Sequence, residues 1–130
     1  MQLLSEEWAE AYTLAWNNDA IIAKKLRFFN TVFKYSISDR EDVEPMIIKV
    51  QKGVCVTYGT RECFTPKEIQ FDLWADTKSW QKVFDKEIGV QKAMVSKGFG
   101  FKGPKLKAFA NMGGFKRSIE VMIEMQGVIV

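Results

Sequence analysis

The chain has 130 residues, of which 47% are hydrophobic and 13% aromatic, and its formal net charge is +3. This composition is sufficient for a hydrophobic core and predicts one globular domain over residues 1–130. The sequence contains no histidine, which excludes the histidine-dependent catalytic triads and removes the commonest side-chain ligand of transition metals.

The N-terminal region predicts two helices followed by a strand. Ser5 precedes an amphipathic helix that carries Trp8 and Trp16 on one face, and Asp19 is placed to cap a shorter helix that ends near Leu26. From residue 28 the apolar period changes to two, which indicates a strand with one apolar side formed by Phe29, Thr31, Phe33, Tyr35 and Ile37.

The middle of the chain predicts a hairpin and a fourth strand. Segments 46–50 and 54–58 are rich in β-branched residues, and Gly53 lies in the turn between them. After a polar interval, residues 69–75 alternate between apolar and polar, and Asp76 or Thr77 is placed to cap a helix. Gly89 interrupts this helical pattern, which then continues to Gly98.

The C-terminal part predicts a fifth strand within residues 98–103 and further helices after it. Pro104 suits the first turn of a helix, and Gly113 and Gly114 are expected to break it before a last helix that begins near Phe115. The predicted fold is therefore α+β, with a five-stranded, mainly antiparallel sheet whose helices pack on one face.

Residues 91–103 read QKAMVSKGFGFKG, a helix followed by a glycine-led strand and a glycine turn. This stretch and the element order resemble the sterol carrier protein 2 sterol-binding domain family, in particular its small standalone prokaryotic members. The resemblance implies an apolar cavity between sheet and helices that binds or transfers a fatty acid, fatty acyl-CoA, phospholipid or sterol-like ligand without catalysis or a cofactor. The chain departs from the family where Pro104 follows the glycine, because many members have an acidic residue there, and its last residues lack a peroxisomal Ser-Lys-Leu signal.

Large apolar residues on the predicted strands and last helices are the candidates for the cavity wall. Methionine side chains are flexible and adapt to ligands of different shapes. The same stripes are equally typical of an ordinary core. The candidate ligand-binding residues are Phe33, Tyr35, Phe71, Leu73, Phe99, Phe101, Met112, Phe115, Ile119, Met122 and Met125.

Residues 88–119 contain seven lysines and arginines and no acidic residue. We expect Lys102, Lys105 and Lys107 to lie near the cavity mouth, where they bind a carboxylate or phosphate head group or contact an anionic membrane transiently. A solvated lysine face is the alternative. Nucleic acid is not expected as a partner, because no RNA-binding motif surrounds the phenylalanines.

Two other functions compete with lipid binding. The apolar face could serve oligomerisation or partner binding, and the carboxylates Asp39, Glu41, Asp42 and Glu44 are the densest acidic cluster, although a strand-ending turn favours a solvated loop over an active site. Cys55 and Cys63 match neither a zinc spacing nor a disulfide framework. We expect a cytoplasmic protein, since no signal peptide or membrane span is evident. Its thiols are expected to be reduced, and we expect a monomer or weak homodimer with no metal site.

Overall fold

The structure is a computed structural model that describes residues 2–125, and its centre is a five-stranded sheet with the order β3-β2-β1-β4-β5. The central strand β1 pairs with β4 in parallel, and the other three strand pairs are antiparallel. The predicted α+β class and mainly antiparallel sheet are confirmed. The strands are β1 (Thr31–Ile37), β2 (Met46–Gln51), β3 (Val54–Gly59), β4 (Phe71–Ala75) and β5 (Phe99–Lys102).

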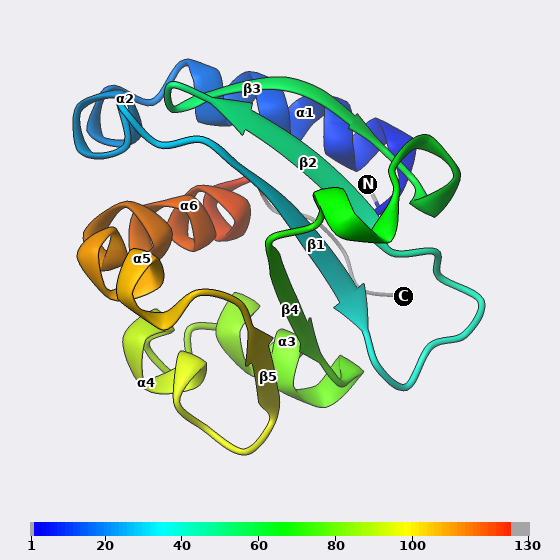
Figure 1. Cartoon of the computed structure of the whole chain (residues 1–130). Helices are drawn as coiled ribbons and strands as arrows, with labels where there is room; N and C mark the ends of the chain where they lie inside the picture. Colours follow the sequence, from blue (N-terminus) through cyan, green and yellow to red (C-terminus); the bar gives the residue numbers. More distant parts are fainter. Residues whose placement is uncertain (1, 126–130) are drawn as a thin grey trace.

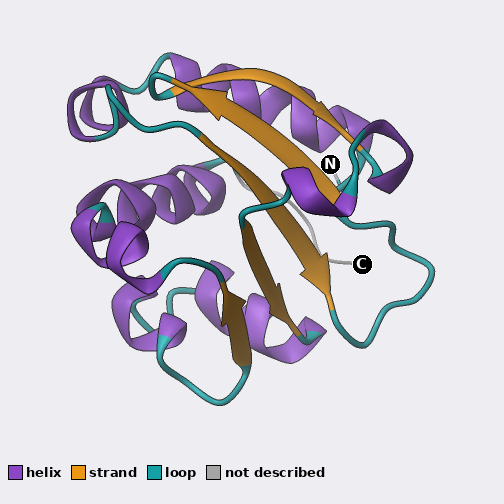
Figure 2. Cartoon of the chain, viewed as in Figure 1, coloured by secondary structure: helices purple, strands orange, loops and turns teal. Residues whose placement is uncertain are grey.

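The helices lie mostly on one side of this sheet. Figures 1 and 2 show α1 behind β2 and β3 and α3 behind β4 and β5, while the connection from β3 to β4, with its two short 3-10 turns, crosses in front. The two faces of the sheet are therefore covered by different kinds of structure. The helices are α1 (Glu6–Asn17), α2 (Ala20–Lys25), α3 (Thr77–Phe84), α4 (Val90–Met94), α5 (Lys105–Ala110) and α6 (Met112–Glu124), and the turns are η1 (Arg61–Cys63) and η2 (Pro66–Glu68).

The predicted helix caps are present. The Ser5 hydroxyl accepts a hydrogen bond from the Trp8 amide at 3.1 Å, and the Asp19 carboxylate accepts one from the Ile22 amide at 2.9 Å. Asp76 caps α3 in the same way through the Ser79 amide. Each cap satisfies a backbone donor that has no partner within the first helical turn, so these three helix starts follow directly from the sequence.

The β2–β3 hairpin is confirmed, and its turn explains the glycine. Lys52 and Gly53 both have positive φ, at 51° and 77°. A Cβ at Gly53 would lie 2.5 Å from the carbonyl oxygen of Leu26, so a side chain there would clash with the backbone of Leu26. The positive φ would also strain any residue other than glycine at this position. The turn thereby packs against the end of α2.

Aromatic residues of α1 pack against the central strand β1 of the sheet. The Tyr12 ring lies 6.1 Å from that of Tyr35, and the Trp16 ring lies 6.1 Å from that of Phe33. The Trp16 indole N–H donates to the Gly53 carbonyl at 2.8 Å, which ties α1 to the hairpin turn. Of the two tryptophans predicted for this helix face, Trp16 packs on the sheet and Trp8 stacks on Tyr12 at 4.8 Å.

The C-terminal helices differ from the prediction. The break lies at Asn111, which ends α5 and precedes α6, and Gly113 and Gly114 are inside α6. Gly114 is buried against Leu26, and a Cβ there would lie 2.2 Å from its Cδ2. The glycine marks a close approach of α6 to α2, which a sequence pattern cannot distinguish from a helix break.

Two boundaries also differ. The first strand begins at Thr31, because Phe29 donates from its amide to Leu26 and belongs to the turn after α2. The helix expected to reach Gly98 ends at Met94. On α5, Leu106 and Phe109 are 88% and 81% exposed.

Candidate ligand cavity

A small cavity lies between the sheet and the helices, where the family resemblance places one. Its volume is about 20 Å³, close to that of a single water molecule. β1, β4 and β5 form one wall, and α4 and α6 form the other. The lining residues are Phe33, Tyr35, Leu73, Met94, Phe101, Phe115, Ser118 and Ile119.

Six of the eleven predicted ligand-binding residues therefore converge on one site. Strand alternation and register explain the sheet wall, because Tyr35 pairs with Leu73 in the parallel ladder and Leu73 pairs with Phe101 in the antiparallel one. Helical spacing explains the opposite wall, since Phe115 and Ile119 are four residues apart on one face of α6.

The other five predicted residues do not line the cavity. Phe71 is fully buried beside it, with its ring 5.6 Å from that of Phe33 and 5.3 Å from that of Phe115. Phe99 packs edge-to-face on Trp80 at 5.1 Å. Met122 is fully buried in the core, whereas Met112 and Met125 are half-buried at the two ends of α6.

Two lining residues were missed. Met94 ends α4, and Ser118 lies three residues after Phe115 on the same face of α6. Helical spacing places Ser118 on the same face as Phe115, but the predicted cavity wall consists of large apolar residues and so leaves out this polar one. Its hydroxyl donates to the Phe115 carbonyl at 2.7 Å, so it presents little free polarity to the cavity.

The polar groups around the cavity are neutral. Burial raises the pKa of the Tyr12 phenol well above its ordinary value and raises that of Tyr35 as well. The Tyr12 hydroxyl donates to the Ser118 carbonyl at 3.0 Å. Among residues 2–125 no charged side chain lines the cavity, so this part of the wall is suited to an apolar group and offers no acid or base for catalysis.

The three predicted head-group lysines do not form one site. Lys102 lies opposite Asp72 in the β4–β5 ladder, on the face of the sheet away from the helices, and Lys105 is exposed at the start of α5. Lys107 points toward the α2–β1 turn, where its ammonium donates to the carbonyl of Asn30 and the side chain of Gln70, both at 2.6 Å. Only Lys107 is thus held in a defined position.

The acidic cluster after β1 has structural partners. Asp39 accepts from the backbone and hydroxyl of Thr77, both at 2.8 Å, at the start of α3. Glu44 pairs with Arg61 at 3.0 Å. The Arg40 guanidinium binds Asp42 through two hydrogen bonds and lowers the pKa of that carboxyl to about 2. These contacts agree with a solvated loop.

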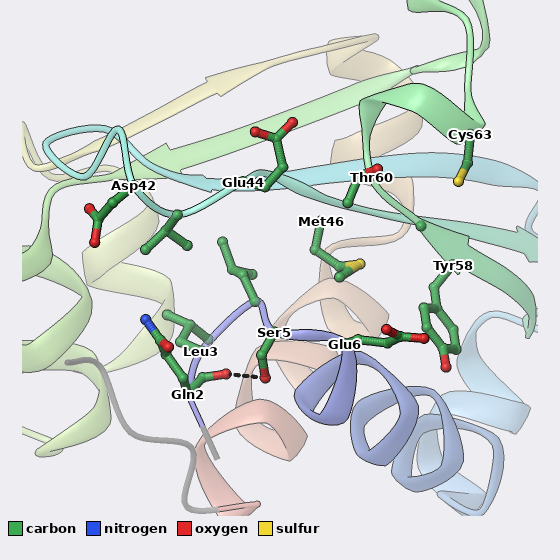
Figure 3. Close-up of a pocket in the computed structure, with 13 residues that line it drawn as sticks. Gln2, Leu3, Ser5, Glu6, Asp42, Glu44, Met46, Tyr58, Thr60 and Cys63 are labelled. Atoms are coloured by element: carbon green, nitrogen blue, oxygen red, sulfur yellow. Dashed lines mark hydrogen bonds between the residues drawn. The ribbon is translucent and has the colours of Figure 1, made fainter.

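A separate surface groove of about 490 Å³ lies beside the start of α1 (Figure 3). Leu3 and Met46 contribute apolar surface, whereas Glu6, Asp42 and Glu44 give the groove an acidic rim. Near the chain start the Ser5 hydroxyl donates to the Gln2 carbonyl at 2.7 Å. Asp42 and Glu44 are paired with Arg40 and Arg61, so Glu6 supplies the remaining acidic charge of the groove, which disfavours a fatty acid or phosphate there compared with the uncharged cavity.

Within residues 2–125 no group of three or more potential metal ligands comes together. Among the same residues no helix is both long and apolar enough to cross a bilayer. Neither finding identifies a function.

Comparison with known proteins identifies the fold. The sequence matches no protein-family model, and no curated protein matches it significantly. A crystal structure of sterol carrier protein 2 superposes with a TM-score of 0.78 at 16% identity, covering 95% of this chain and 98% of that one. The conserved hypothetical protein TT1886 of Thermus thermophilus, described as a candidate sterol carrier protein, gives 0.79 at 18% identity and covers 98% and 92%.

A ubiquinone synthesis protein named UbiJ-SCP2 is more distant, with a TM-score of 0.55, 10% identity and coverage of 90% and 96%. All three likenesses extend over most of both chains. The chain therefore has the fold of sterol carrier protein 2.

Proposed function

We propose that this protein binds or transfers a hydrophobic ligand, a fatty acid, fatty acyl-CoA, phospholipid or sterol-like molecule, between its sheet and helices, and that it catalyses no reaction. The observation that carries the proposal is the uncharged cavity, lined by six of the predicted residues, in a fold shared with a sterol carrier protein. The absence of histidine from the chain and the structural partners of the acidic loop favour a non-catalytic role.

The ligand site must expand to be occupied. Sites for small molecules enclose about 300 Å³ or more, whereas this cavity has about 20 Å³. We infer that a ligand displaces α4 and the neighbouring α5 from the sheet, while α1 and the central strands stay in place. Burial of an acyl chain recovers about 0.8 kcal/mol for each methylene group, which offsets the cost of opening.

α4, which forms part of the cavity wall, and the neighbouring α5 are the helices with the fewest stabilising contacts. α4 and α5 begin without a side-chain cap, and Ala108 is the single buried residue of α5. Phe101 lines the cavity and is also 36% exposed, so the cavity comes close to solvent at β5. Short, uncapped elements with little buried surface open at low cost. Entry past Phe101 is therefore favoured over entry through the α1 side.

The test combines native mass spectrometry of the purified protein with displacement of a fluorescent fatty acid. We expect co-purified lipid, or displacement by unlabelled lipids at micromolar concentration. Phe101→Asn should raise the dissociation constant about tenfold, because it places an amide on an apolar wall. Phe64→Asn is the matched control, since Phe64 is half-buried but lies outside the cavity.

The proposal fails if no lipid co-purifies and none of the four ligand classes displaces the probe. The proposed position of the ligand site is wrong if Phe101→Asn and Phe64→Asn raise the dissociation constant equally. Circular dichroism and thermal unfolding of both variants establish that the comparison is between folded proteins.

A further inference from the structure

The end of the molecule formed by α2 and α5 exposes large apolar side chains. Phe28, Leu106 and Phe109 are 79%, 88% and 81% exposed. Leu106 and Phe109 are three residues apart and share one face of α5, while Ala108 on its other side is buried. Figure 1 shows α2 and α5 at the same end of the molecule. Such a concentration of exposed apolar side chains is typical of an interaction surface.

A basic groove separates these two elements. It has a volume of about 490 Å³, and four of its eight lining residues are cationic while none is acidic. Lys105 and Lys116 are also exposed, on α5 and on α6. The residues that line the groove are Lys24, Lys25, Arg27, Phe28, Phe29, Asn30, Lys107 and Asn111.

Hydrogen bonds and cation–π contacts fix the groove before any partner binds. The Lys107 ammonium, besides its bonds to Asn30 and Gln70, lies 4.9 Å from the centre of the Phe29 ring. The Asn111 side chain donates to the Lys107 carbonyl at 2.8 Å. On the opposite side the Arg27 guanidinium lies 4.6 Å from the centre of the Phe28 ring. Lys107 is therefore a positioning residue, and the exposed lysines are the ones free to meet a partner.

We propose that Phe28, Leu106 and Phe109, with the surrounding lysines and Arg27, form a docking surface for a bilayer that contains anionic phospholipid. Phenylalanine and leucine insert at the boundary between head groups and acyl chains, and lysines around them bind the negative head groups. A second copy of the chain is disfavoured as the partner, because two such surfaces would bring like charges together. This docking surface goes beyond the proposed ligand cavity and shares no lining residue with it.

Vesicle co-sedimentation tests the proposal with the full chain. We expect binding to vesicles of phosphatidylcholine mixed with phosphatidylglycerol, weak binding to phosphatidylcholine alone, and release at high salt. Lys24→Glu with Lys25→Glu, and separately Leu106→Ser with Phe109→Ser, should each weaken partitioning at least about tenfold. All four positions are exposed, so the fold should persist.

Matched controls lie on other helices. Lys78→Glu with Lys82→Glu on α3 reverses the same number of exposed charges, and Leu14→Ser on α1 removes a leucine that is 64% exposed. These controls should bind vesicles like the unmodified protein. The docking variants should still bind the fluorescent fatty acid, which separates failure of this surface from failure of the cavity.

Three results would overturn the proposal. The first is equal binding to neutral and anionic vesicles, and the second is loss of binding in the control variants to the same extent. The third is binding of a single-stranded oligonucleotide, but not of vesicles, through the same lysines, which would assign the surface to nucleic acid.

Discussion

The phenol of Tyr12 donates a hydrogen bond to the backbone carbonyl of Ser118 at 3.0 Å, which joins α1 to α6 beside the cavity. Both residues are buried, so Tyr12→Phe leaves that carbonyl without this donor. We expect the variant to lose about 1 to 3 kcal/mol of unfolding free energy, measured by urea denaturation.

Tyr58→Phe is the control for this change. Tyr58 is half-buried, and within residues 2–125 its hydroxyl makes no hydrogen bond, so its removal should change the unfolding free energy by less than about 0.5 kcal/mol. Equal losses in the two variants would show that the Tyr12 hydrogen bond does not secure α6.

Gly113 and Gly114 are neighbours on α6, but a side chain has room at Gly113 and has none at Gly114. A Cβ at Gly114 would overlap Leu26, and Gly114→Ala should therefore destabilise the protein by about 1 to 3 kcal/mol. At Gly113 the nearest group is the flexible end of Lys25, 3.2 Å away, so Gly113→Ala should stabilise the helix by about 0.5 to 1 kcal/mol.

Thermal unfolding of the two alanine variants measures this contrast. If both variants were stabilised, helix propensity and not the contact with Leu26 would decide the effect; if both were destabilised, the site at Gly113 would be as restricted as that at Gly114. Circular dichroism should show unchanged helix content in each variant.

Local patterns predicted much of the fold. Ser5, Asp19 and Asp76 begin their helices as expected, because a cap depends on residues within one turn. Strand alternation placed Phe33, Tyr35 and Leu73 on the face that meets the helices, which is why these residues reach the cavity.

The remaining errors involve contacts between distant segments. Gly114 was interpreted as a helix break because its partner, Leu26, lies at the end of α2 and leaves no local signal. The sequence places the methionines of α6 in the cavity wall because they are apolar. In the structure Met122 lies on the face of α6 that packs into the core, and Ser118 lies on the face that lines the cavity. The side of α5 that faces the protein is set by its contact at Ala108, which leaves Leu106 and Phe109 exposed and has no local signal in the sequence.

The ion pair between Arg117 and Asp19 predicts a dependence of stability on pH. The two side chains are 2.7 Å apart, and hydrogen bonding to the Arg117 guanidinium lowers the pKa of the Asp19 carboxyl. A carboxyl whose pKa is lower in the folded state stabilises the fold above the unfolded pKa of about 3.9, and this contribution is lost as the pH falls through the lower folded value.

Asp19→Asn keeps an N-cap for α2 but removes the charge. The unmodified protein should be more stable than this variant near neutral pH, and the difference should shrink once the pH falls below about 4. Urea denaturation across this range measures it. Glu87→Gln is the control, because Glu87 is exposed and within residues 2–125 forms no ion pair. A difference that is constant with pH would show that the charge of Asp19 contributes nothing.

Opening of the cavity predicts an uneven pattern of amide hydrogen exchange. Residues 90–111 include two short uncapped helices and the exposed edge strand β5, whereas α1 is capped and buries two tryptophans. We expect the amides of residues 90–111 to exchange faster than those of α1, because local opening is easiest where little surface is buried. Addition of a saturating fatty acid should slow exchange in residues 90–111 and leave α1 unchanged, since the ligand holds this region in a single bound state. Slower exchange in α1 alone would instead place ligand entry at the α1 side of the sheet.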